Sequence, residues 1–261
     1  MDNQTTPPAA PTPEVQNEAK PKKKAGFFRK VFYVFLVVMI IIVLGLGYLG
    51  FMPGVSKIFG SDKPRNLGVV ASAEDEQAVM DKLAVQYLGL TGSTSFSISG
   101  QKSVDTAFTD KELTALMASH EKMWKHYPVS NAQVRFNADG TAEVSGILRT
   151  DRIFEYAAAT GIDTSDVKKW MDKVKIAVNN PPFYVKGRAE VNSGVLSGAL
   201  MKVEVGRLPI PLSLIAPDES DVNSFAQNRL SKAGVRVEEG SFGEGKVNFK
   251  GTIPAQVGFS K

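Results

Sequence analysis

One stretch of the chain is far more apolar than the rest. Residues 31–56 contain no charge in 26 positions, and the dense part of the run extends from Val31 to Met52. At ~1.5 Å rise per residue, these 22 positions form a helix of roughly 33 Å, enough to cross a hydrocarbon core of about 30 Å. The run predicts one transmembrane helix over residues 31–52. The membrane-spanning residues are expected to include Val31, Phe35, Met39, Ile42, Leu46 and Leu49.

A cleaved signal peptide is the main alternative for this run, because basic residues precede it and an Ala-x-Ala triplet occurs at residues 71–73. The run is roughly twice as long as a signal-peptide core, and it ends about 20 residues before the triplet. We therefore interpret it as an uncleaved signal-anchor. Six basic side chains lie at 20–30 and only three at 57–65, which predicts a cytoplasmic N-terminus. The chain is thus expected in the cell membrane as a single-pass protein, with its C-terminal domain extracytoplasmic.

The segments beside the run have the composition of linkers. Residues 1–20 contain four prolines and one large aliphatic side chain, Val15, so the Pro-rich and basic cytoplasmic tail 1–30 is predicted to be disordered. Residues 53–71 are rich in Gly and Pro and show no clear period, which is typical of a tether. The extracytoplasmic domain is then expected to occupy residues 72–261.

Within this domain, helical and strand periods alternate. Ser72 is a candidate N-cap, and Thr109 with Glu112 is a candidate capping box. Helices are predicted at residues 72–89, 109–124, 151–159, 164–178 and 217–234. Three β-hairpins are predicted, with turns at Asp139-Gly140, at 192–194 and near 243–245. The predicted fold class is α+β: a single N-terminal transmembrane helix, followed by an extracytoplasmic domain of antiparallel β-hairpins with packed helices.

Composition and charge exclude several classes of function. The chain has no cysteine, which excludes thiol catalysis, iron–sulfur clusters and cysteine-bound zinc. The first 30 residues carry six basic and three acidic side chains, so +3 of the formal +4 charge belongs to the tail. The outer domain is therefore close to neutral, and no nucleic-acid partner is expected.

Motifs that would indicate catalysis are missing from the sequence. His120 and His126 are six positions apart, about 240° around a helix, so they cannot form the two-histidine face of an HExxH zinc helix. We expect His120 to be partly buried instead. There is no GxSxG elbow, P-loop or dinucleotide fingerprint, and paired carboxylates such as Asp75-Glu76 are expected to be solvated. The protein is predicted to be non-enzymatic, without catalytic residues, metal ligands or a cofactor.

The predicted strands have one apolar face that is unusually thin, because glycine and alanine occupy several of its positions. Either a helix packs very close to the sheet, or the sheet bends around a groove for an acyl chain. The candidate apolar ligand face consists of Val185, Gly187, Ala189, Leu196, Gly198, Leu200, Val247 and Phe249.

A proline-rich segment, residues 205–217, places large apolar side chains between three prolines, which interrupt sheet and helix alike. It is either an edge strand followed by a helix start, or the rim of an apolar site or a docking edge for a partner. The candidate rim or docking edge consists of Leu208, Pro209, Ile210, Pro211 and Leu212.

Three stretches together carry a family resemblance: FTDKELTALM from Phe108, a hairpin ending in VSGIL, and SGALMKVEVGRLPIP before a helix. They resemble the YpmS-type membrane-anchored bacterial proteins over residues 108–254. That family is similar to tubular lipid-binding domains of the BPI type, whose curved sheet wraps a helix and holds lipid tails. The chain departs from it in its long Pro-rich tail and its pronounced helix at Thr109.

The resemblance implies a membrane-anchored extracytoplasmic module that binds or passes a lipid or lipid-linked envelope molecule. The alternative is a scaffold that docks another envelope or membrane protein. The expected partners are therefore the lipid bilayer, together with a lipid ligand or an envelope protein.

Overall fold

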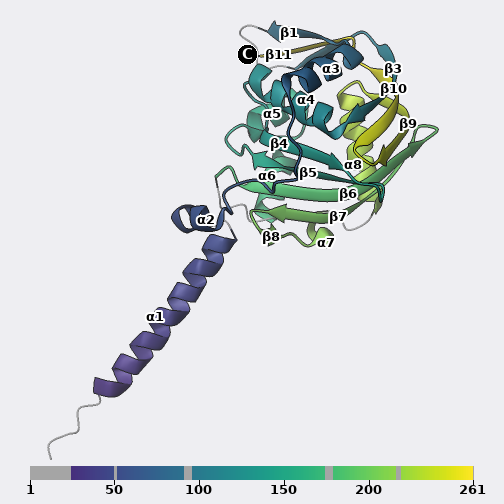
Figure 1. Cartoon of the computed structure of the whole chain (residues 1–261). Helices are drawn as coiled ribbons and strands as arrows, with labels where there is room; N and C mark the ends of the chain where they lie inside the picture. The colour runs from purple at the N-terminus through teal and green to yellow at the C-terminus, as the bar shows by residue number, and fades with distance from the viewer. Residues whose placement is uncertain (1–24, 50–51, 91–95, 174–178, 216–218, 261) are drawn as a thin grey trace, which may run out of the picture. The chain divides into compact units, whose positions relative to one another are not determined.

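A computed structural model describes most of the chain after the N-terminal tail (Figure 1). The described residues are 25–49, 52–90, 96–173, 179–215 and 219–260. The chain divides into two units, residues 1–42 and 43–261. Most of the predicted disordered tail, residues 1–24, lies outside the described residues, as do residues 50–51 of the predicted transmembrane run.

Helix α1 (Ala25–Tyr48) covers most of the apolar run. Large apolar side chains are exposed along its described part, among them Phe35, Met39 and Ile42. Among the residues that the structure describes, none of the helices combines the length and the apolarity needed to cross a membrane.

The second unit is an α+β domain built on an antiparallel sheet, which confirms the predicted fold class at this level. Its helices are α2 (Pro53–Phe59), α3 (Ala73–Leu83), α4 (Asp110–Met123), α5 (Ile153–Ala159), α6 (Thr164–Lys173), α7 (Leu212–Ile215) and α8 (Glu219–Lys232). Its strands are β1 (Gln86–Leu90), β2 (Ser97–Ser99), β3 (Lys102–Thr109), β4 (Val129–Phe136), β5 (Thr141–Leu148), β6 (Pro182–Asn192), β7 (Val195–Val205), β8 (Leu208–Pro209), β9 (Arg236–Gly243), β10 (Lys246–Ile253) and β11 (Gln256–Ser260).

The large sheet is curled because β6 has two different neighbours on one side. Its strand order is β3-β10-β9-β6-β5-β4, and β7 pairs with the other side of β6. Residues 182–188 of β6 pair with β5, whereas Glu190 and Val191 pair with β9. The sheet therefore divides at the end of β6 into a β5-β4 arm and a β9-β10-β3 arm. A small second sheet has the order β1-β11-β2.

Local signals in the sequence locate most elements correctly. The three predicted hairpins form as β4-β5, β6-β7 and β9-β10. The helix predicted over 72–89 is too long, because it ends at Leu83 and Ala84 adopts a left-handed conformation with φ 43°. Residues 86–90 instead form β1, which pairs in parallel with β11.

The β3 and β10 end of the sheet holds the largest core. Val79 of α3 is fully buried against Val104 and Phe108 of β3 and Ile253 of β10. Seven partly buried side chains pack around them: Leu83, Val85, Leu113, Leu116, Val235, Val247 and Phe249. Helices α3 and α4 thus close this end of the domain.

Helix α4 also covers the outer edge of β4. The hydroxyl Oγ1 of Thr114 accepts the backbone N–H of Val134 at 3.0 Å. A free edge strand offers unpaired backbone groups to other chains. Thr114 therefore satisfies part of an edge that would otherwise be open.

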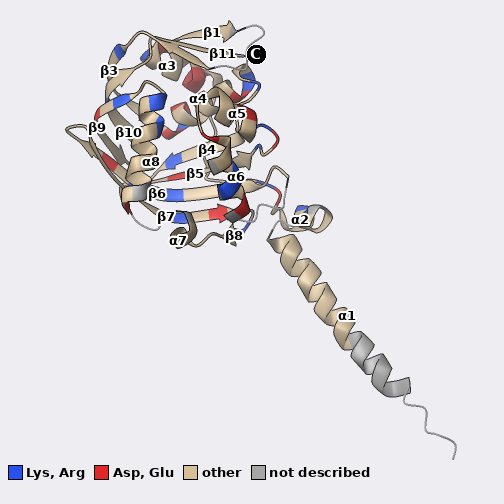
Figure 2. Cartoon of the chain, turned by 180° about the vertical axis from the view of Figure 1, so that it is seen from behind, with Lys and Arg blue, Asp and Glu red and all other residues tan. Residues whose placement is uncertain are grey.

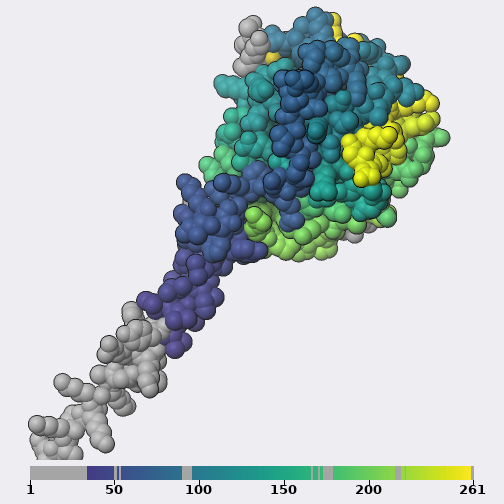
Figure 3. All heavy atoms as spheres, in the orientation of Figure 1, coloured from purple at the N-terminus to yellow at the C-terminus, as the bar shows by residue number. Residues whose placement is uncertain are grey.

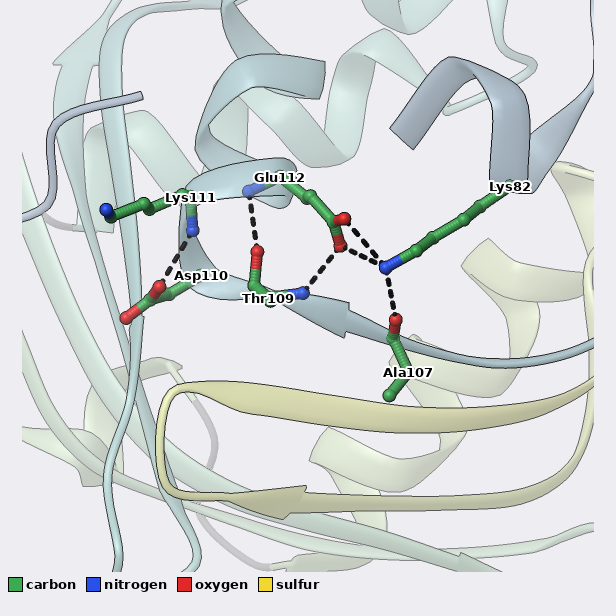
Figure 4. A network of polar contacts seen from close by, with 6 residues as sticks. All are labelled: Lys82, Ala107, Thr109, Asp110, Lys111 and Glu112. Atoms are coloured by element: carbon green, nitrogen blue, oxygen red, sulfur yellow. Dashed lines mark hydrogen bonds and ion pairs between the residues drawn. The ribbon is translucent and has the colours of Figure 1, made fainter. Parts of the chain in front are cut away.

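A polar network joins α3, α4 and β3 (Figure 4). Lys82 Nζ donates to both carboxylate oxygens of Glu112 at 2.7 Å and to the carbonyl oxygen of Ala107 at 2.8 Å. Glu112 also accepts the backbone N–H of Thr109 at 2.9 Å, while its own N–H donates to the Thr109 hydroxyl at 3.1 Å. This is the capping box predicted from the sequence, and Lys82 extends it to the neighbouring helix.

The segment predicted to be a tether differs from that expectation. It begins with α2 and continues as a strap, residues 61–71, which lies on the surface between α2 and α3 (Figure 3). Leu67 and Val69 are buried against Tyr184 of β6, and Arg65 makes a 2.7 Å ion pair with Glu204 of β7. These contacts order the strap, because they bury apolar side chains and neutralise a buried carboxylate.

Candidate functional site

The strand register places the predicted ligand face on one face of the curled sheet, but the packing divides its residues between different clusters. Val185 and Leu200 pack on a cluster of Val203, Val205 and Ile210. Val247 and Phe249 pack instead on the core beneath α3 and α4. The remaining members continue the same row on the β6-β7 hairpin, where Gly187 pairs with Leu200 and Ala189 with Gly198. Leu196 lines a cavity beside α8, and Ala189 and Gly198 also line a separate pocket.

The predicted rim packs against one part of the predicted face. Ile210 is buried, and Leu208 and Leu212 pack around it. Pro209 and Pro211 remain exposed. The short strand β8 pairs with the end of β7, and α7 follows at once, so the proline-rich segment forms an edge strand and a helix start. The predicted rim thus packs directly on Val185 and Leu200 of the predicted ligand face at this end of the sheet.

The small residues on this face are explained by the close approach of the β6 and β7 backbones. A Cβ atom on Gly187 would lie 2.9 Å from the carbonyl oxygen of Ala199, and one on Gly198 would lie 2.9 Å from that of Arg188. A β-bulge occurs at this point, between Lys186 and Gly187. Small residues are needed here because the backbone of the neighbouring strand is close, and a ligand is not required to explain them.

A cavity of ≈ 300 Å³ lies between α8 and the β6-β7 hairpin. Its apolar lining comes from β6, β7, α8, β9 and the turn before β9, and consists of Val191, Leu196, Leu230, Val235 and Val237. Polar side chains, including Gln227 and Arg236, line the rest. This cavity is a possible site for part of an apolar ligand.

The outer side of β7 is the other candidate site. On the side away from β6, β8 pairs with only Glu204 and Val205 of this strand, and no described strand pairs with the stretch from Val195 to Lys202. Helices α7 and α8 pack against β7 (Figure 1). Four large apolar side chains on these elements are exposed: Val195, Met201, Leu214 and Phe225. Met201 is 51% exposed and Phe225 67%, which is high for apolar residues in a folded domain.

Charges of both signs surround this edge. Lys202 binds Glu204 at 2.8 Å, and Arg188 of β6 lies 3.8 Å from Glu219 of α8. Figure 2 shows basic and acidic residues on β6 and β7. The edge therefore has an apolar and a polar component without a strong net charge, which suits a protein partner better than a polyanion.

His120, the first histidine of the HExxH-like segment, is packed among aromatic side chains. Nε2 of His120 lies 3.3 Å from the hydroxyl of Tyr87, and the ring also contacts Tyr127. Burial lowers the pKa of His120 to about 4, so the imidazole is neutral at physiological pH. Within the described ranges, there is no group of three or more side chains that could hold a metal ion.

Two features of the β7 region were not predicted from the sequence. The ion pair between Arg65 and Glu204 joins residues that are 139 positions apart, and no local pattern indicates it. The exposure of Phe225 was also missed, because an apolar residue inside a helical period normally faces the core.

Comparisons of the chain with protein-family models, with curated proteins and with solved structures found no match.

Proposed function

We propose that this protein is a membrane-anchored, non-enzymatic scaffold whose outer domain docks a partner protein along β7. The observation that carries this proposal is the outer edge of β7 from Val195 to Lys202: β6 pairs with this stretch on one side, no described strand pairs with it on the other, and Val195 and Met201 are exposed on it. An extended segment of an envelope or membrane protein would add to this edge as a further strand. The run 31–52 would hold the domain at the membrane.

The contrast with the opposite edges supports this choice. Thr114 occupies part of the edge of β4, and Lys82 binds the Ala107 carbonyl of β3. Proteins usually protect edge strands in this way, and an edge left unprotected is a common site of strand addition. Exposed Met201 lies on the stretch of β7 whose outer edge has no strand partner among the described residues.

Site-specific photo-crosslinking in intact membranes tests the proposal. A photoreactive amino acid at Val195 should form a defined protein adduct, and Met201→Lys in the same chain should abolish it. A charge on an edge strand disfavours strand addition. The matched control is Phe154→Lys, since Phe154 is an exposed apolar residue on α5, away from β7. If the adduct is absent, or if both lysine variants leave it unchanged, docking along β7 is excluded.

A second candidate is lipid carriage, which the ≈ 300 Å³ cavity beside α8 favours together with the family resemblance. Native mass spectrometry with organic extraction, on residues 53–261 purified without detergent, would detect a bound lipid. The fragment starts before the strap, because a start at 72 would remove Arg65 and Leu67 from the sheet.

The substitution for this second test must lie in the cavity. Gly187 is unsuitable, because a side chain there would disturb strand pairing whether or not a ligand binds. Leu230→Trp should displace a cavity lipid, and Leu214→Trp on the exposed surface of α7 should retain it. A clean apo mass that takes up no added lipid would exclude lipid carriage.

A further inference from the structure

Helix α2, directly after the apolar run, carries an apolar side chain, Ile58, that is unusually exposed. Ile58 is 80% exposed, the highest value among the large apolar side chains that the structure describes. Phe59 beside it and Tyr48 at the end of α1 are also exposed, and their rings meet edge-to-face with centroids 6.0 Å apart. A cluster of this kind gains free energy on transfer from water into an apolar layer.

The other side of α2 is fixed in place within the second unit. Ser56 and Ser61 are almost fully buried, and the Ser61 hydroxyl donates to the carbonyl oxygen of Tyr48 at 2.6 Å. The side chain of Val55 lies directly over Gly47, so closely that a Cβ atom on Gly47 would clash with it. The exposed side of α2 is therefore held in one orientation.

The β7-β8 turn contributes to the same arrangement. The backbone N–H of Arg207 donates to the carbonyl oxygen of Leu49 at 3.1 Å, and its guanidinium lies 3.5 Å from the carbonyl oxygen of Gly60. Gly60 ends α2 in a left-handed conformation with φ 62°. Ile58 and Phe59 are thus presented by a braced turn, not by a free linker.

The composition of α2 and of the residues beside it fits the interfacial layer of a membrane. Exposed Lys57 of α2 and Lys63 after it are suited to anionic headgroups, and aromatic side chains such as Tyr48 at the end of α1 prefer the interface. Pro53 begins the helix one residue after the apolar run ends at Met52, so α2 follows the predicted span without a spacer.

We propose that α2, with Tyr48, is a seat that lies in the headgroup layer of the outer leaflet and inserts Ile58 and Phe59 toward the acyl chains. This inference rests on the proposed membrane anchor over residues 31–52. The partner is the anionic lipid surface itself. Because α2 is braced against the β7-β8 turn, the seat fixes the height of the domain above the membrane.

Single-cysteine labelling tests the seat, and the chain is suited to it because it has no native cysteine. The full-length variants Ile58→Cys, Val70→Cys and Ile42→Cys are labelled with an environment-sensitive nitrobenzoxadiazole dye. They are then reconstituted into vesicles of phosphatidylethanolamine and phosphatidylglycerol. Val70, which is 79% exposed on the strap, is the matched control for an equally exposed apolar position.

The proposal expects the dye at position 58 to be blue-shifted and several-fold less quenched by aqueous iodide than the dye at 70. If 58 is quenched as strongly as 70 while 42 is shielded, the anchor stands and the seat is wrong. If 42 is quenched as well, the anchor itself fails, and the seat fails with it. Replacing phosphatidylglycerol by phosphatidylcholine should weaken the shielding at 58, since the contribution of Lys57 and Lys63 is electrostatic.

Discussion

The two ends of the curled sheet are closed by different means. At the β3 and β10 end, α3 and α4 bury Val79 and Phe108, and Lys82 joins the two helices through Glu112. At the β7 end, the chain folds its own continuation, β8 and α7, over the sheet and leaves Met201 exposed. The first end is thus closed by a buried core, whereas the second keeps apolar surface exposed.

The largest expected effect on stability is at the β3 and β10 end. Phe108 is buried and lies against Val79 and Phe249, so Phe108→Ala should lower the free energy of unfolding by about 3–5 kcal/mol. Leu212→Ala at the β7 end should cost less, because Leu212 is only partly buried. Urea unfolding of residues 53–261 measures both values. Equal losses would show that the two ends are closed equally well.

The pH dependence of stability should also come from the β3 and β10 end, where α4 carries His120. His120 has a folded-state pKa of about 4 against an ordinary value near 6.5, so the unfolded chain binds a proton that the native state excludes. This stability is fully present above pH 6.5 and is lost as the pH falls toward 4, by up to about 3 kcal/mol. In urea unfolding between pH 4 and 7, His120→Gln should show a smaller slope than the wild type. An unchanged slope would assign the pH dependence to carboxylates.

These two predictions use residues whose surroundings the sequence indicated only in part. The capping box of Thr109 and Glu112 and the turn at Gly140 were predictable, because their signals lie within a few residues. The extent of helix α3 was not, because residues 86–90 take their conformation from β11, about 170 positions later. Local pattern predicts local structure, and long-range pairing overrides it where it competes.

The candidate site shows the same limit. Alternation correctly predicted that Val185 and Leu200 share an apolar face, and prolines correctly marked β8 as an edge. The sequence could not indicate that Ile210 would pack on that face, because nothing in the pattern gives the direction in which the chain turns after Val205. It also could not indicate that residues 61–71 pack on the sheet, since their composition is that of a linker.

The ion pairs Lys82–Glu112 and Arg65–Glu204 should differ in how much each contributes to the free energy of unfolding. Lys82→Met leaves Glu112 with an 8% exposed side chain and only its capping partners, so we expect a loss of about 1–3 kcal/mol. Arg65→Met should cost about 1 kcal/mol or less, because Glu204 keeps Lys202 at 2.8 Å and Arg65 is partly exposed. Unfolding of the double variant Arg65→Met, Lys202→Met checks this explanation, since its loss should exceed the sum of the two single losses.

The smallest effect on stability is expected where the effect on binding is largest. Met201 is half-exposed and lies on the stretch of β7 whose outer edge has no partner strand in the described residues, so Met201→Lys should change the free energy of unfolding by no more than about 0.5 kcal/mol. The same change should abolish the adduct at Val195. If it instead destabilises the domain as strongly as a core substitution, the β7 edge belongs to the packed interior, and the difference between the two ends disappears.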